Sequence, residues 1–192
     1  MTDASTAYDT SGITFTALDQ TTADDLRRIA RETIAFQPEV AEHILAMLRA
    51  LAPVYVGFPV DQLTHNLQTA ALAEQAGADT EMVVAALCHD IGKAVSIANH
   101  PRIAAEILRP YVREEVRWVI EVHQDFQGRF YFGHIGLDPD AREKHAGNEW
   151  YDAAARFTDE WDRRAFDPDF DTPPLEYFEE RVREVFARPH MI

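Results

Sequence analysis

Cysteine is almost absent from this chain. The 192 residues include a single cysteine, Cys88, so no disulfide can form within the chain, and a lone thiol is typical of proteins in a reducing compartment. The sequence also contains no apolar run of about eighteen residues and no recognisable secretory signal peptide. We therefore expect a soluble, cytoplasmic protein that does not span a membrane.

Positive charge is scarce as well. The chain has 18 Lys and Arg residues against 33 Asp and Glu residues, and its formal net charge is −15. Binding to nucleic acid or to an anionic membrane requires basic patches, so both partners are disfavoured. We expect a small-molecule partner, and the sequence leaves the oligomeric state open. Only two lysines occur, Lys93 and Lys144, so Lys93 is a candidate for a specific role, with ordinary surface placement as the alternative.

Strand patterns and phosphate-binding loops are also missing. No paired stretches of alternating apolar residues occur, and no glycine-rich loop follows a strand-like stretch, which disfavours a nucleotide-binding α/β fold. Apolar residues recur at helical spacing instead, as in residues 40–51. We predict an all-α protein in which residues 1–20 form a flexible N-terminal arm and residues 21–192 form a single domain closed by a C-terminal helix.

Three metal-binding side chains lie on two successive predicted helices. His65 lies early on the first, while His89 and Asp90 close the second; Gly77 suits the turn between them, and Thr80 is the expected cap of the second helix. Adjacent helical residues point about 100° apart, so a His-Asp doublet suits a centre in which the carboxylate bridges two metals. The alternative is an ordinary helix end, where His is favoured by the helix dipole.

Three further candidates follow on later predicted helices. His100 lies at a helix entrance, His123 lies on a buried helical stripe, and Asp162 borders the core side of a helix that begins near Asn148. The alternative for His123 is a hydrogen-bonded core residue, and for Asp162 a solvated acidic face. Imidazole and carboxylate donors without thiolates suit iron, manganese or magnesium better than an iron–sulfur cluster or a structural zinc site.

These ligands together resemble a known set. His65, the His89-Asp90 doublet, His100, His123 and Asp162 occur in the order seen in the dinuclear form of the HD-domain superfamily, and the resemblance runs from about Tyr55 to Asp162. Within the superfamily the chain is most similar to the mixed-valent diiron oxygenases. The stretches that carry this similarity are Tyr55-x-Gly57, Gln62-Leu63-x-His65-x-Leu67-Gln68, Gly77-Ala78-Asp79-x-Glu81-Met82-Val83 and Ala85-Ala86-Leu87-x-His89-Asp90.

The resemblance implies an HD-domain helical bundle that holds two iron ions as Fe(II)/Fe(III). One iron would take His65, His89 and Asp162. The second would take His100 and His123 and keep open positions for substrate and O2. Asp90 would bridge the two.

Two more residues are assigned by the resemblance. Tyr55, ten residues before the first ligand, is similar to a gate that occupies the open metal position until substrate arrives. Lys93 is similar to the lysine that contacts substrate in members that oxidise myo-inositol. We therefore expect Tyr55 and Lys93 to be catalytic residues, with Lys93 also binding substrate.

Three positions depart from the members that cleave an aminohydroxyethyl phosphonate. Phe58, Gln127 and Asp159 stand where those members have Glu, Lys and Arg. The loss of two cations and the gain of a carboxylate disfavour a phosphonate dianion. We expect Lys93, Gln127 and Asp159 to face the second metal and to bind a substrate with hydroxyls or an ammonium group.

Three functions follow, in order of preference. The first is an O2-dependent diiron oxygenase that oxidises or cleaves a small alcohol or amino alcohol. The second is a phosphohydrolase that uses Mn or Mg, and the third is a metal-stabilised helical module that binds a partner.

Residues 124–139 lack helical periodicity and could form a lid, but the sequence assigns no role to Arg129 or His134 within it.

Overall fold

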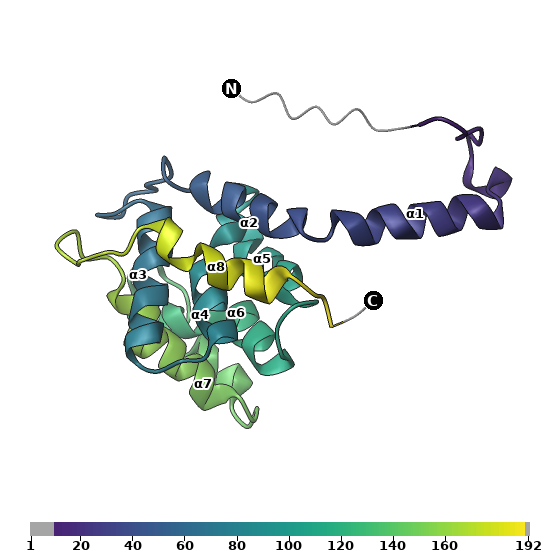
Figure 1. The fold of residues 1–192 in the computed structure, drawn as a ribbon. Coiled ribbons are helices and arrows are strands. Elements are labelled where there is room, and N and C mark those ends of the chain that lie inside the picture. Colours follow the sequence, from purple (N-terminus) through teal and green to yellow (C-terminus); the bar gives the residue numbers. More distant parts are fainter. Residues whose placement is uncertain (1–9, 191–192) are drawn as a thin grey trace. The chain divides into compact units, whose positions relative to one another are not determined.

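The computed structural model describes residues 10–190 and is built from helices (Figure 1). Eight α-helices, several short 3₁₀-helices and one π-helix occur in this part of the chain, and no β-strand does. The prediction of an all-α protein is therefore confirmed. None of the helices found between residues 10 and 190 is both long enough and apolar enough to cross a membrane.

The chain divides into two compact units, and the division falls between Gln37 and Pro38. The described part of the first unit contains η1 (Leu18–Gln20) and α1 (Ala23–Phe36). The boundary predicted from the sequence lies after residue 20, whereas this division lies after Gln37 and therefore includes α1 in the smaller unit. Residues 1–9 of the expected arm lie outside the described residues, and the single domain proposed for residues 21–192 stays a prediction.

The second unit is a bundle of seven α-helices within residues 38–190. They are α2 (Glu39–Arg49), α3 (Gln62–Gln75), α4 (Thr80–Cys88), α5 (His100–Leu108), α6 (Glu114–Gln127), α7 (Tyr151–Arg156) and α8 (Leu175–Phe186). Helix α3 packs along α4, and α5 packs along α6. Helix α8 lies against α2 and α4 (Figure 1), and its apolar face is buried.

An aspartate caps the N-terminus of each of the two helices α3 and α4. The Asp61 carboxylate accepts a hydrogen bond from the backbone N–H of Thr64 and so caps α3. Helix α4 is capped in the same way by Asp79, which accepts from Met82, so the prediction of Thr80 as the cap was wrong by one residue. Gly77 has φ 77°, the left-handed conformation expected after α3.

The predicted helix from Asn148 to Asp162 is divided into three segments. Helix α7 is followed by the π-helix η7 (Phe157–Trp161) and the 3₁₀-helix η8 (Asp162–Arg164). At the end of η7, the backbone N–H of Asp162 donates to the carbonyls of Phe157 and Thr158, which widens the turn just before Asp162. Such π segments occur frequently at functional sites, because they redirect the side chains that follow.

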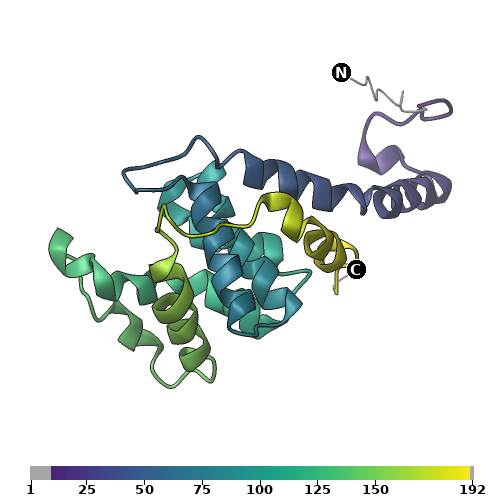
Figure 2. The same cartoon turned by 60° about the vertical axis from the view of Figure 1, so that its left-hand side comes forward.

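Short 3₁₀-helices connect α6 to α7. They are η4 (Gly128–Phe130), η5 (Phe132–Ile135) and η6 (Ala141–His145), and they gather at one end of the second unit (Figure 2). Helix α6 continues to Gln127, so the first four residues of the expected irregular segment, 124–127, are helical. The rest of residues 124–139 is irregular or 3₁₀, as expected.

Gly92 lies directly against the backbone of His100. It belongs to η2 (Ile91–Ala94), which packs on α5. A Cβ added at Gly92 would lie 2.3 Å from the carbonyl oxygen of His100 and 2.7 Å from its Cα. Only glycine permits this approach, so the segment after Asp90 can hold the start of α5 in place.

Replacing Gly92 with Ala should therefore destabilise the protein. Backbone atoms cannot move aside cheaply, so we expect a loss of about 1–3 kcal/mol, which corresponds to a fall in Tm of roughly 2–4 °C per kcal/mol. Thermal unfolding followed by circular dichroism measures this. Gly133→Ala is the matched control, because a Cβ there meets no atom within 4 Å. Equal Tm values for the two variants would contradict the packing argument.

Candidate metal centre

All four candidate histidines orient their rings in the same way. In each ring Nδ1 lies within hydrogen-bond distance of a backbone carbonyl, and a carbonyl oxygen only accepts, so Nδ1 carries the hydrogen. The pairs are His65 with Ala165 (2.8 Å), His89 with Ala86 (2.8 Å), His100 with Ile97 (2.8 Å) and His123 with Ile120 (2.7 Å). In the neutral imidazole this leaves the lone pair of each Nε2 free to bind a cation.

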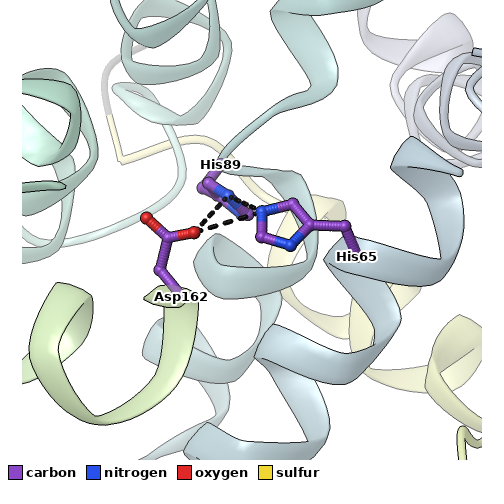
Figure 3. A group of neighbouring side chains, drawn as sticks. All are labelled: His65, His89 and Asp162. Carbon is purple, nitrogen blue, oxygen red and sulfur yellow. Dashed lines mark hydrogen bonds and ion pairs between the residues drawn. The ribbon is translucent and has the colours of Figure 1, made fainter. Parts of the chain in front are cut away.

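The first cluster joins three helical segments. His65 from α3, His89 at the end of α4 and Asp162 after the π-helix point toward one another (Figure 3). Asp162 Oδ1 lies 3.1 Å from His65 Nε2 and 3.6 Å from His89 Nε2, and the two Nε2 atoms lie 3.1 Å apart. Three acceptor atoms this close repel one another unless a proton or a metal ion lies between them.

Asp90 lies between this cluster and the other two histidines. Its Oδ2 is 3.5 Å from both His65 Nε2 and His89 Nε2. Its Oδ1 is 2.9 Å from His100 Nε2 and 3.6 Å from His123 Nε2. One oxygen thus faces each pair of imidazoles, which is the arrangement that a carboxylate bridging two metals requires.

The six residues are buried, and none is more than 5% exposed. Asp90 Oδ1 and Asp162 Oδ2 nevertheless have no hydrogen-bond donor. His100 Nε2 lies close to Asp90 Oδ1 but has no hydrogen to donate while Nδ1 carries the proton. Buried carboxylates without enough counter-charge are strongly unfavourable, so the donor set fits metal ions.

The ionisation of the two carboxylates agrees with this. Burial raises the pKa of Asp162, but positive charge and hydrogen bonding at the Nε2 atoms of His65 and His89, which arise only when those atoms bind a second proton, outweigh burial and hold that pKa far below its ordinary value. Burial likewise raises the pKa of Asp90, but positive charge at His89, donation from His100 and His123 when their Nε2 atoms bind a second proton, and the Lys93 ammonium lower it well below its ordinary value. Both groups are therefore carboxylates at neutral pH, ready to bind cations.

Lys93 lies beside the centre, next to Asp90 Oδ2, the oxygen that faces His65 and His89. Its expected place facing the second metal and its contact with substrate stay predictions. Its ammonium group donates to Asp90 Oδ2 and to Gln62 Oε1, the latter at 2.6 Å. Gln127 is also close, but its Nε2 donates to Asp162 Oδ1 at 3.0 Å. Gln127 therefore contacts a ligand of the first cluster instead of facing the second, and its contact with substrate stays a prediction.

Two predicted residues are not brought into the centre. The side chain of Tyr55 is exposed, with 55% of its surface accessible. Asp159 is 37% exposed and pairs with Arg142 at 3.4 Å, while its carbonyl accepts from Arg163. Arg142 therefore neutralises the charge of the Asp159 carboxylate. The roles of Tyr55 as a gate and of Asp159 in substrate binding stay predictions.

The sequence analysis missed the aromatic surroundings of His65. Phe166 stacks on the His65 ring with centroids 4.2 Å apart, and Phe58 stacks on Phe166 at 4.8 Å. From the sequence, Phe58 was noted only as a difference from the phosphonate-cleaving members, and Phe166 was given no role. No sequence pattern relates two residues that lie so far apart in the chain. Gln62 was also missed, although its place three residues before His65 put it near the same helix face.

Loss of Asp90 should remove more metal than loss of a residue that is proposed to bind one metal only. Among the residues that the structure describes, only Asp90 has an oxygen toward each pair of histidines, so Asp90→Ala should lose both ions, whereas His123→Ala should keep the ion of the first cluster. Metal content per chain, measured by elemental analysis after gel filtration, tests this. His134→Ala is the control, because His134 is exposed. Equal metal losses for Asp90→Ala and His123→Ala would contradict a bridging role.

One comparison with known proteins identifies a family. The model of the HD domain matches residues 63–167, which is more than half of the chain and contains all six candidate ligands. No curated protein matches the sequence. HD domains bind divalent metals and are typically metal-dependent enzymes. Two groups of ligand atoms lie close enough together to hold an ion, one from His65, His89 and Asp162 and the other from His89, Asp90 and His123. The chain therefore belongs to the HD domain family.

Proposed function

We propose that this protein is an O2-dependent diiron oxygenase that oxidises or cleaves a small substrate bearing a hydroxyl group or an amino alcohol. The observation that supports a pair of metals is the placement of Asp90, which turns one carboxylate oxygen toward His65 and His89 and the other toward His100 and His123. A single buried metal needs no such double-sided carboxylate, whereas a coupled pair of metals does. Oxidation is preferred over phosphate hydrolysis because Lys93 and Arg142 are already paired with carboxylates.

Each metal position has a different set of protein ligands. His65, His89 and Asp162 would hold one iron, His100 and His123 would hold the other, and Asp90 would join them. The second position has one protein ligand fewer, which leaves coordination places for a substrate hydroxyl. When bound, the Fe(II)/Fe(III) pair supplies the redox chemistry that uses O2 as the oxidant.

Lys93 is the residue of this chain best placed to orient a substrate. An ammonium group has three N–H donors, and two of them are occupied by Asp90 and Gln62. The third can donate to a substrate oxygen next to the metal ligands. The stacked rings of Phe58 and Phe166 cover His65 and exclude water from that side.

The charges around the centre favour a neutral or cationic substrate over a phosphate ester. Phosphoryl transfer requires positive groups that stabilise charge on the phosphoryl oxygens. Lys93 is already paired with Asp90, and Arg142 is paired with Asp159. Arg102 and Arg129, the other cations that the sequence suggested for phosphate binding, are exposed.

A phosphohydrolase that uses Mn or Mg is the second candidate. The family match favours it, because the HD domain suggests metal-dependent hydrolases and phosphohydrolases as a class. In that case the same six residues would hold the metals, and a metal-bound water would attack the phosphate ester.

The metal centre and its reaction distinguish the two candidates. We expect the protein expressed with iron to contain two iron ions per chain and to give the electron paramagnetic resonance signal of a coupled Fe(II)/Fe(III) pair. It should consume O2 with a member of a panel of polyols and amino alcohols. Two Mn or Mg ions, no mixed-valent signal, and phosphate release from p-nitrophenyl phosphate would overturn the oxygenase proposal in favour of the hydrolase.

Replacing Lys93 with Met should lower the rate of O2 consumption by about 100-fold, because a substrate that is not oriented reacts slowly. The rate is measured at saturating iron with the panel compound that the unmodified protein consumes fastest. Lys144→Met is the matched control, since Lys144 is the other lysine, is 58% exposed and pairs with Asp125. Unchanged activity in Lys93→Met would remove Lys93 from the mechanism.

A further inference from the structure

The side-chain amide of Gln62 is held in one orientation, and only one of its two polar atoms has a hydrogen-bond partner. Gln62 is fully buried, and its Oε1 accepts a hydrogen bond from Lys93 Nζ at 2.6 Å. An ammonium group can only donate, so the oxygen of the amide must face Lys93 and the nitrogen must face away from it. Gln62 Nε2 has no hydrogen-bond partner in the structure.

This unpaired nitrogen belongs to the surroundings of the metal ligands. Gln62 lies one helical turn before His65 on α3, and Lys93 connects its amide to Asp90 Oδ2. Asn66, one turn after Gln62, is fully buried too, and both of its amide atoms lack partners. Buried polar groups are almost always paired, so this face of α3 lacks hydrogen-bond partners that a bound molecule could supply.

We propose that Gln62 selects the substrate: its Nε2 donates a hydrogen bond to a second oxygen of a molecule whose first hydroxyl lies at the metals, while its Oε1 holds Lys93 in place. The inference deepens the proposed function and rests on it. Gln62 is thus a specificity residue through its nitrogen and a positioning residue through its oxygen.

The arrangement defines the chemistry of the ligand. Gln62 Nε2 and the remaining N–H of Lys93 are both donors, so the ligand must present at least two oxygen acceptors close together, as in a vicinal diol or a polyol. The Phe58 ring lies 5.9 Å from Lys93 Nζ and offers an apolar surface for the carbon atoms of such a molecule. A ligand with one hydroxyl would leave the amide nitrogen of Gln62 unpaired.

Gln62→Glu separates the two functions of the amide. A glutamate keeps an oxygen that can accept from Lys93 but has no N–H to give to a ligand, whereas Gln62→Met removes both. Gln75→Glu, at the exposed end of α3, is the control for the added charge. Each protein is loaded with Mn²⁺, its metal content is measured, and binding of glycerol and of propan-1-ol is followed by the paramagnetic relaxation of their protons.

We expect the unmodified protein and Gln75→Glu to bind glycerol more tightly than propan-1-ol. In Gln62→Glu the affinity for glycerol should fall by about tenfold, as for the loss of one hydrogen bond, while propan-1-ol binding and metal content stay the same. Gln62→Met should in addition weaken propan-1-ol binding, because Lys93 loses a partner.

Three results would overturn the assignment of Gln62. They are equal glycerol affinities in Gln62→Glu and the unmodified protein, no discrimination between the two alcohols by the unmodified protein, and no binding of either alcohol near the metal. Failure of the oxygenase proposal is a separate result: discrimination that depends on Gln62 without any O2 consumption would keep the role of Gln62 and reject oxygenase activity.

Discussion

The repulsion among buried acceptor atoms is the constraint on which this structure depends. Four Nε2 lone pairs and the oxygens of Asp90 and Asp162 meet where water is excluded, and the backbone carbonyls that bind each Nδ1–H prevent the neutral rings from donating inward. Only protons or metal ions can stabilise such a group of atoms. The metal ions are therefore expected to be part of the folded state and to contribute to its stability.

Helix ends place these atoms. His89 and Asp90 follow α4, His100 begins α5, and Asp162 follows the π-helix η7, so four of the six candidate ligands lie where a helix starts or stops. Side chains at helix ends can point along the axis and not only outward, which allows the adjacent residues His89 and Asp90 to reach the same centre. Gly92 then lets the chain turn directly against the backbone of His100.

The sequence could predict six candidate ligands, which the structure brings together, because their order along the chain carries the information. Regular spacing revealed the helices, and six metal-binding residues on successive helices indicated the centre. It could not predict the stacking of Phe166 on His65 or the pairing of Asp159 with Arg142, because such contacts depend on tertiary packing between segments without a shared pattern. The sequence also did not reveal that the predicted helix from Asn148 to Asp162 is divided into α7, η7 and η8, because its apolar residues follow helical spacing throughout.

The most direct test of the account is the anomalous diffraction of a crystal of the protein grown with iron. The account predicts two anomalous peaks on either side of Asp90, roughly 3.5–4 Å apart, one among His65, His89 and Asp162 and the other beside His100 and His123. A single peak, with Asp90 turned toward one ion only, would contradict a dinuclear centre.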